Sequence, residues 1–475
     1  MQVSHAPGQV SAVFDDPNLV SCGGLAPVLA LAQACGLSQL VADTLTLTGP
    51  GSANATVKVP ALVAGMVAGA DSTDDMDLLR HGGMDRLFTG VRAPSTLGTF
   101  LRTFTFGHVR QLDVVAARML TELAARTSLL PGADQVTFVD IDDTIRATHG
   151  YAKQGAGFGY SGVKGLNALL ATISTPVCAP VIAATRLRKG SANSGRGAAR
   201  LVADALKTAK GAGAGGPGGE GLVVLRADSA FYSHDVIAAA RRAHARFSIT
   251  ARMNPAVAKA IGTIDEHGWT PIHYPHAVWD EAEQRLISDA EIAEIAFTAF
   301  TSRPVSEHIT GRLIVRRVKR LNPTTGPKTP KAIPDQQQEL FATYRHHAVF
   351  TDSPLTLEQA EKTHRGHAII EQVIADIKNG PLAHLPSGKF TANAAWLVLA
   401  AIAFNLTRAA GTLASTFHAR ATTATIRNHL IGVAVRLAHS ARRQVMHLPQ
   451  AWPWQDAWQQ LFDLTMGAPP AATTH

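Results

Sequence analysis

Cysteine, aromatic residues and charged residues are all scarce in this 475-residue chain. It contains 3 cysteines, 6% aromatic residues and 17% charged residues. Cys22, Cys35 and Cys178 are odd in number and far apart, which argues against a disulfide framework and against a cysteine-based zinc cluster. This sparing use of cysteine is typical of a protein that works in a reducing cytosol.

Two kinds of hydrophobic segment are also missing. The N-terminus shows no basic stretch followed by an apolar one, so no secretion signal is predicted. The most apolar stretch, residues 396–404, is far shorter than the roughly 20 residues that span a bilayer. We therefore expect a cytoplasmic protein with no membrane partner, in which residues 396–404 form a buried helix.

Positive charge is in excess and is unevenly distributed. The chain has 44 Lys and Arg against 36 Asp and Glu, a net charge of +8. Residues 1–134 carry −3 and the remainder carries +11. Such a balance suggests a polyanionic partner, most often nucleic acid, although a basic protein without such a partner has the same balance.

The first part of the chain is predicted to be helical. Hydrophobic periodicity and Ser/Thr/Asp helix-start signals recur between residues 24 and 127. Residues 31–38 have the small-residue and glycine turn of a helix-turn-helix, a pattern that ordinary helical pairs also show. This region is a candidate for binding DNA ends, but its net negative charge is unfavourable for binding a polyanion.

After residue 134 the pattern changes to strands. Residues 135–144, 166–175, 181–187, 222–228 and 247–251 read as strands, and residues 198–208 and 235–245 read as helices. Alternation along the first strand places Asp140 and Asp142 on one face and Asp143 on the other. The order predicts an α/β domain that begins with an antiparallel meander.

Residues 255–350 break this rhythm with short β-like runs. Between Arg312 and Lys331 there is no acidic residue, and seven are basic: Arg312, Arg316, Arg317, Lys319, Arg320, Lys328 and Lys331. We interpret this run as a contact with the DNA backbone, since phosphate contacts dominate affinity for DNA. A solvated basic surface without a partner is the alternative.

Residues 364–378 are predicted to form one amphipathic helix. Ile370, Val373, Ile374 and Ile377 recur at the spacing of a buried face. The neighbouring stripe contains His364, His367, Glu371 and Lys378, because residues three, four and seven apart lie above one another. One edge of this helix therefore carries two imidazoles, a carboxylate and an ammonium group.

Three carboxylates stand out as a possible metal site. Asp142 and Asp228 fall at strand ends and Glu371 lies on the helix, with 86 and 143 residues between them. Carboxylates that gather from distant segments repel one another, and divalent cations offset that repulsion. Two Mg²⁺ ions about 4 Å apart would activate water or a 3′-hydroxyl and stabilise the leaving oxygen of a phosphodiester. Taken singly, each acid could equally be a helix cap or an exposed strand end.

A set of motifs over most of residues 135–410 resembles one family. The segments are Val139-Asp140-Ile141-Asp142-Asp143-Thr144, Gly162-Val163-Lys164-Gly165-Leu166-Asn167, Leu187-Arg188-Lys189-Gly190, Leu225-Arg226-Ala227-Asp228, and residues 364–378 followed by Lys389-Phe390-Thr391-Ala392-Asn393. Together they resemble DDE-type insertion-sequence transposases, in particular the insertion-sequence 1380 family (group 1 DDE transposases). The resemblance implies a ribonuclease-H-like mixed sheet with flanking helices, a β-rich insertion and an all-α N-terminal region.

The resemblance also implies a domain order. It predicts a helical N-terminal region at 1–130, a catalytic core at 131–254 and 351–415 that is interrupted by the β-rich insertion at 255–350, and a basic helical C-terminal region at 416–475.

Asp142, Asp228 and Glu371 correspond to the family's catalytic, metal-binding triad. Asp142 lies in an Asp-x-Thr unit with Thr144, and Asp140 is the fallback for the first acid. The implied cofactor is a pair of Mg²⁺ ions, with Mn²⁺ as a substitute.

Related transposases carry Tyr, Arg, Glu and Lys at positions that correspond to His364, His367, Glu371 and Lys378 here, so two of the four depart from the pattern. Histidines can still donate to phosphate, and Arg365 can supply the missing guanidinium. The predicted DNA-contacting residues are Lys378, His367, His364, Arg365, Arg316, Arg317, Lys319 and Arg320. Either Trp269 or Trp279 could stack on a flipped base, or both could be ordinary core residues.

The implied function is metal-dependent cleavage and strand transfer at the ends of an insertion sequence. Its partners would be double-stranded DNA, both the terminal inverted repeats and the target, and a second copy of the chain in a paired-end complex. The expected location is the bacterial cytoplasm, in association with the nucleoid.

Two other readings remain open from sequence alone. Residues 139–144 also resemble the Asp-x-Asp-x-Thr motif of haloacid-dehalogenase-type phosphatases, with Asp140 as nucleophile and Asp142 as acid/base, although Thr144 comes one position early. That reading leaves Glu371, Lys378 and the basic run without a role. A catalytically dead DNA-binding relic is the third possibility, and the presence of all three acids argues against it.

Overall fold

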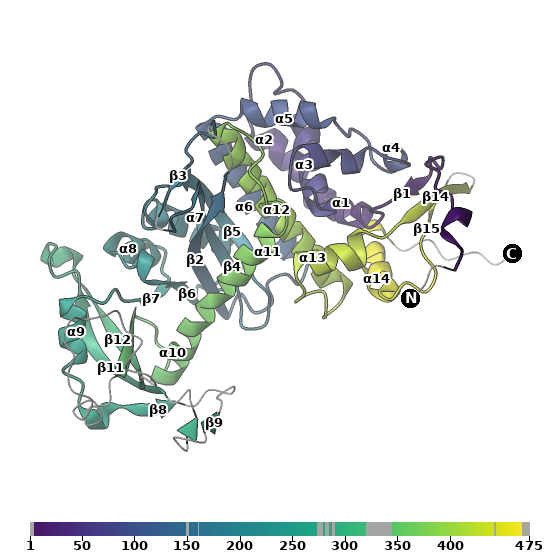
Figure 1. The fold of residues 1–475 in the computed structure, drawn as a ribbon. Coiled ribbons are helices and arrows are strands. Elements are labelled where there is room, and N and C mark those ends of the chain that lie inside the picture. The colour runs from purple at the N-terminus through teal and green to yellow at the C-terminus, as the bar shows by residue number, and fades with distance from the viewer. Residues whose placement is uncertain are drawn as a thin grey trace. The chain divides into compact units, whose positions relative to one another are not determined.

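The chain forms two compact units, drawn in Figure 1. This computed structural model describes residues 4–148, 152–159, 161–272, 279–280, 285–286, 290–319, 344–440 and 443–467. Unit 1 comprises Met1–Leu129, Gly150–Gln154 and Asp376–His475. Unit 2 comprises Leu130–His149 and Gly155–Ala375.

Unit 1 is a helical assembly around one long apolar helix. Its elements are α1 (Leu25–Ala34), α2 (Leu37–Thr44), α3 (Ala55–Ala68), α4 (Met84–Leu87), α5 (Pro94–Thr103), α6 (Phe106–Arg126), α12 (Phe390–Ala414), α13 (Thr423–Ile426) and α14 (Gln455–Met466). Helix α12 packs against α1, α3, α5, α6, α13 and α14. It is apolar on all sides, as expected of a helix covered by others, and 89% of its most hydrophobic 18-residue window is buried. By length and composition alone this helix could also cross a membrane.

The C-terminal part differs from the predicted order in two respects. Residues 376–414, which the predicted order places with the catalytic core, lie in unit 1, where other helices pack against α12. The region expected to be helical from 416 onward also contains a β-hairpin, β14 (Val435–Ser440) and β15 (Arg443–His447). Strand β14 pairs with the short N-terminal strand β1 (Leu19–Val20).

The candidate helix-turn-helix is a bent helix pair. Helices α1 and α2 are joined by Cys35 and Gly36, and Gly36 takes the left-handed conformation at φ 73°. The bend between them is 48°. Helix-turn-helix pairs cross at about 90–120°, so this geometry does not favour that assignment.

Unit 2 is built on one mixed sheet. Its strands are β2 (Val136–Ala147), β3 (Gly157–Phe158), β4 (Lys164–Ser174), β5 (Val181–Lys189), β6 (Leu222–Ala227), β7 (Arg246–Thr250), β8 (Thr270–Ile272), β11 (Ala290–Ala299), β12 (Ile309–Lys319) and β13 (Tyr344–Thr351). The order across the sheet is β3-β4-β2-β6-β7-β13-β12-β11-β8, and β5 also pairs with β4. Strands β2, β4 and β5 are antiparallel neighbours, whereas β6 runs parallel to β2 and β7 runs parallel to β6.

Helices connect the parallel strands, as the predicted order requires. Helix α7 (Ala198–Gly211) lies between β5 and β6, and α8 (His234–Arg242) lies between β6 and β7. The segment from 255 onward begins with α9 (Pro255–Ile261) and continues with the antiparallel strands that extend the sheet. The two-residue strands β9 (Trp279–Asp280) and β10 (Arg285–Leu286) pair separately. The mixed α/β class is therefore confirmed, and the described residues of this segment are mainly in strands.

The predicted helix over 364–378 is broken into two helices. Helix α10 (Leu357–Arg365) begins at a capping box of Thr356 and Gln359, and α11 (Ile369–Lys378) follows after a 3₁₀ turn at Gly366–Ala368. A 3₁₀ residue advances by 120° rather than 100°, so a three-residue turn rotates the following helix by about 60°. The side chains of α10 and α11 consequently do not form the single stripe that uninterrupted helical spacing predicts.

Candidate active site

Two of the three predicted carboxylates lie on neighbouring parallel strands, but Asp142 is within β2 rather than at its end as predicted, and only Asp228 directly follows its strand, β6. Strands β2 and β6 are parallel, with Ile141 directly opposite Ala227. Asp142 and Asp228 are the next residues on the two chains, and alternation directs them to the same face. The Asp142 carboxylate accepts the Asp143 amide at 2.7 Å, and the Asp228 carboxylate accepts the Ala230 amide at 2.9 Å.

The third carboxylate, Glu371, influences the first electrostatically. Burial, the largest cause, and the negative charges of Asp228, Asp143 and Glu371 together raise the pKa of Asp142 to about 7, against the lowering effect of the Asp143 amide. The pKa of Asp228 is also raised, chiefly by desolvation, while a positive charge on His367 lowers it. Glu371 itself is exposed in the first turn of α11. The charges of Asp228 and Glu371 thus both act on Asp142.

Carboxylates that repel one another match the donor chemistry of a divalent-cation site. They are not drawn into a closed cluster, however. Across the residues that the structure describes, no three Asp, Glu, His or Cys side chains are close enough to hold one ion. What the geometry shows is an arrangement of three oxygen donors that a cation would have to draw together.

Asp140, the fallback for the first acid, has a structural role. Its side chain is fully buried, and both oxygens accept from Arg226, from Nε at 2.7 Å and from Nη2 at 2.7 Å. A nucleophile must reach its substrate, and this carboxylate is sealed in an ion pair. The position of Asp140 therefore argues against the phosphatase reading and favours Asp142 as the reactive acid.

Asp143 is likewise held within the fold, on the opposite face of the sheet. It accepts from Asn167 at 3.0 Å and forms a buried ion pair with Arg188. Arg188 also donates to the Asn167 side chain and to the backbone carbonyl groups of residues 193, 194 and 196. This network fixes the strand that presents Asp142.

His364 is buried against two hydroxyl groups of β7. It is 4% exposed, with Nδ1 at 3.0 Å from the Ser248 hydroxyl and Nε2 at 2.9 Å from the Thr250 hydroxyl. Burial lowers its pKa to about 3, so the imidazole is neutral. A buried neutral ring is unsuited to binding phosphate, so the structure does not favour His364 as a DNA contact.

The other residues of this helical segment occupy different positions. His367 is half-buried, with Nδ1 at 2.7 Å from the His364 carbonyl oxygen. Arg365 donates through Nε to both oxygens of the buried Glu361, at 2.8 and 2.9 Å. Lys378 is the half-buried last residue of α11. A cavity of about 160 Å³ in unit 2 is lined in part by His367 and Arg365.

Of the basic run, the side chains of Arg312, Arg316 and Arg317 are described, and all three lie on β12. Arg317 is 6% exposed, and its guanidinium bonds to Glu266 at 2.6 and 2.9 Å and to Glu291 at 2.6 Å. Trp269 and Tyr344 stack on it, with ring centroids 4.3 and 4.4 Å from its Cζ atom.

These contacts occupy Arg317 and give Trp269 a packing role rather than a base-stacking one. Arg316 lies 3.6 Å from Glu361. The side chains of Lys319 and Trp279, and Arg320, Lys328 and Lys331 altogether, fall outside the described residues.

Sequence reasoning missed the residues that hold this site together, namely Arg226, Ser248, Thr250 and Glu361. One signal was available for Arg226, because an arginine within an apolar strand needs a buried partner. The other three carry no comparable local signal.

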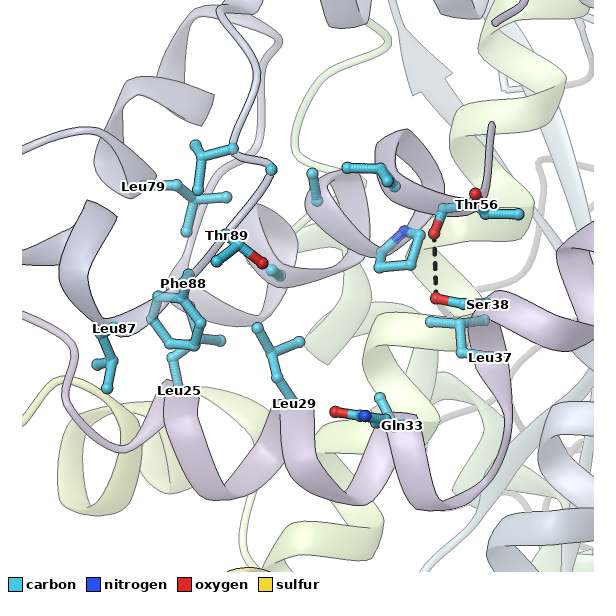
Figure 2. A pocket seen from close by; sticks show the side chains of 17 residues that line it. Leu25, Leu29, Gln33, Leu37, Ser38, Thr56, Leu79, Leu87, Phe88 and Thr89 are labelled. Atoms are coloured by element: carbon cyan, nitrogen blue, oxygen red, sulfur yellow. Dashed lines mark hydrogen bonds between the residues drawn. The ribbon is translucent and has the colours of Figure 1, made fainter. Parts of the chain in front are cut away.

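A larger cavity of about 440 Å³ lies in unit 1 and is shown in Figure 2. Leu25 and Leu29 of α1 and Phe88 contribute to its mostly apolar lining. The Ser38 hydroxyl donates to the Thr56 carbonyl group at 3.0 Å on its wall. No predicted catalytic or DNA-contacting residue is among the described residues that line it.

A family model described as transposase DDE domain, group 1, matches residues 4–466, nearly the whole chain. No curated protein matches it.

Proposed function

The chain belongs to the group 1 family of DDE-domain transposases, and from that premise we propose that it cleaves and joins DNA at the ends of an insertion sequence. The observation that carries this proposal is the placement of Asp142, within β2, beside Asp228, directly after the parallel strand β6, with Glu371 close enough to raise the pKa of Asp142. Acids that raise one another's pKa in this way cluster at functional sites.

We also propose that unit 2 has a ribonuclease-H-like core. Three antiparallel strands followed by two parallel strands with helical crossovers suit a ribonuclease-H-like core. Strands β8, β11, β12 and β13 then form the β-rich insertion between the second Asp and the Glu. The motifs quoted above support membership of the insertion-sequence 1380 family within the group.

Asp142, Asp228 and Glu371 would hold one or two Mg²⁺ ions, with Mn²⁺ as a substitute. Bound there, a divalent ion would lower the pKa of water or of a 3′-hydroxyl and stabilise the leaving oxygen of the phosphodiester. The carboxyl group of Asp142 must lose its proton to serve as a ligand, and its raised pKa makes that step sensitive to pH near neutrality. Exposed Glu371 supplies its carboxylate from the opposite, helical side.

For the DNA contacts we propose Lys378, His367 and Arg365, and we retain Arg316, Lys319 and Arg320 as candidates. His364 and Arg317 are left out, because both are buried in contacts within the fold. The net charge of +11 beyond residue 134 supports a polyanionic partner for this part of the chain. Terminal inverted repeats and target DNA would be that partner, with two copies pairing the ends in the cytoplasm.

A cleavage assay tests the proposal. Duplex DNA that carries the element's two ends is incubated with the protein in Mg²⁺ or in EDTA, and strand breaks at the ends are measured. We expect end-specific cleavage only with Mg²⁺, and a loss of at least 100-fold in Glu371→Gln. Glu358→Gln is the matched control, since Glu358 is an exposed glutamate on α10. Equal cleavage by wild type and Glu371→Gln, or in Mg²⁺ and EDTA, would overturn the proposal.

A further inference from the structure

The segment that precedes Glu371 is fastened to the sheet at three points. Nη1 of Arg226 donates to the Thr363 carbonyl oxygen at 2.8 Å. The two ring nitrogens of His364 lie 3.0 and 2.9 Å from the hydroxyls of Ser248 and Thr250 on β7. All three contacts fall in the last turn of α10, immediately before the 3₁₀ turn that leads into α11.

Arg226 is itself fixed on its other sides. Its guanidinium is shared with Asp140 through two bonds of 2.7 Å, and the two residues are 3% and 0% exposed. Its Cζ atom lies 4.0 Å from the ring centroid of Phe138. A guanidinium with this many partners cannot move without breaking a buried ion pair, so it is a rigid support for the Thr363 carbonyl group.

The supports form one row across three strands. Asp140 on β2 is opposite Arg226 on β6, and Arg226 is opposite Ser248 on β7. Two residues further along each chain come Asp142, Asp228 and Thr250, on the same face of the sheet. The row that fastens the helix is therefore one step from the row that presents the two aspartates.

We propose that Asp140, Arg226 and His364 are positioning residues that hold the start of α11, and with it Glu371, in register with Asp142 and Asp228. This rests on the proposed function, in which those three acids bind the metal. A side chain at the start of a helix moves with the helix, so the tether sets how far Glu371 lies from Asp142 and Asp228. In other words, the chain uses a second set of polar residues, beside the acids, to set the geometry of the acids.

Gly366 shows how closely the helical segment approaches this support. A Cβ atom added to it would lie 2.8 Å from Nη1 of Arg226. Its φ of −61° is one that any residue adopts, so glycine is not needed for the backbone conformation. An alanine side chain at position 366 would occupy the space beside Arg226. Arg226 cannot move aside while it is hydrogen-bonded to Asp140 and to the Thr363 carbonyl group.

Stability alone does not account for this arrangement. Buried ion pairs are weak contributors to stability, and well-packed apolar side chains of similar volume often replace them without loss. An apolar pair at positions 140 and 226 would fill the space but could not donate to the Thr363 carbonyl group. A positioning role therefore predicts that metal binding and thermal stability respond differently to the same substitution.

Gly366→Ala is the decisive variant, and Gly262→Ala is its control. Gly262 also ends a helix of unit 2 with φ −65°, but a Cβ atom there would lie 3.5 Å from its nearest neighbour, an ordinary van der Waals distance. We measure Mn²⁺ binding to the DNA-free protein, the Mg²⁺ concentration for half-maximal cleavage, and Tm. For Gly366→Ala we expect at least a tenfold weaker response to both metals with Tm within about 3 °C of wild type, because alanine favours helix. Gly262→Ala should match wild type in both metal measurements.

A double variant, Asp140→Leu with Arg226→Met, removes the ion pair without leaving a buried charge unpaired, and it should show the same tenfold loss. Its control, Arg186→Met with Asp204→Asn, removes the 2.9 Å ion pair between β5 and α7, which lies away from α10. Metal responses within twofold of wild type for folded Gly366→Ala would overturn the positioning proposal. If wild type binds Mn²⁺ but cleaves no end DNA, the proposed function fails instead, and the Mn²⁺ measurements still decide the positioning role.

Discussion

Asp140 and Asp142 lie two residues apart on one face of β2, and the charges around them give them different roles. Asp140 faces a guanidinium that takes both of its oxygens. Asp142 receives one backbone amide and faces the negative charges of other acids. The strand pattern placed both residues on one face, but it could not show which carboxylate is compensated, since Arg226 lies 86 residues away. Asp142, which we propose as the reactive acid, is the one whose charge the fold leaves uncompensated.

This difference predicts an effect of pH on stability. The pKa of Asp142 is about 7 in the folded protein against an ordinary value of 3.8. Between these values the folded state binds more protons than the unfolded state, so the contribution of Asp142 to stability falls as pH rises. Metal-free Asp142→Asn should therefore have a higher Tm than wild type at pH 8, with a smaller difference at pH 5.

Differential scanning calorimetry in EDTA at both pH values measures this effect. Asp134→Asn is the control, because Asp134 is exposed just before the same strand and should show no such trend. A Tm difference for Asp142→Asn that is equal at pH 5 and pH 8 would contradict the argument.

At the scale of elements, periodicity located the strands and helices but not their breaks or their partners. The helical character of residues 364–378 was predictable from the spacing of the apolar residues. The 3₁₀ turn at Gly366–Ala368 was not, because it reflects a close approach to Arg226 rather than a local preference. The strand around residues 313–315 was equally predictable, but the partners of Arg317 were not, since it pairs with acids 26 and 51 residues away.

Arg317 on β12 offers a direct test of whether this residue stabilises the fold or contacts DNA. Arg317→Met removes the guanidinium that pairs with two carboxylates and stacks on Trp269 and Tyr344. We expect this loss to destabilise the fold by about 1–3 kcal/mol. Because Arg317 is enclosed, affinity for DNA should stay within twofold of wild type when measured well below Tm.

Urea denaturation and a DNA titration measure these two quantities. Arg242→Gln at the exposed end of α8 serves as the control and should change stability by no more than about 0.5 kcal/mol. A marked loss of DNA affinity in Arg317→Met without destabilisation would instead support the prediction that Arg317 contacts the DNA backbone.

At the scale of the whole molecule, unit 1 joins segments that the sequence presented as separate regions. The all-α character of residues 24–127 and the burial of residues 396–404 were both predictable from composition and periodicity. That the former cover the latter was not, because a helix that is apolar on all sides gives no direction in which to look for its neighbours. In the structure α1, α3, α5 and α6 pack around α12, so residues from both ends of the chain form one core.

Removing the N-terminal helices should therefore expose α12. A chain that begins at residue 130 leaves α12 without α1, α3, α5 and α6, and we expect it to aggregate or to bind a hydrophobic dye strongly. Co-expression of residues 1–129 as a separate chain should restore solubility, since the contacts are not covalent. Deleting residues 1–9 alone should leave solubility unchanged, because residues 4–6 and 8–9 are exposed. A soluble chain from residue 130 that binds no dye would show that α12 is covered by other means, and would count against the division of the chain into these two units.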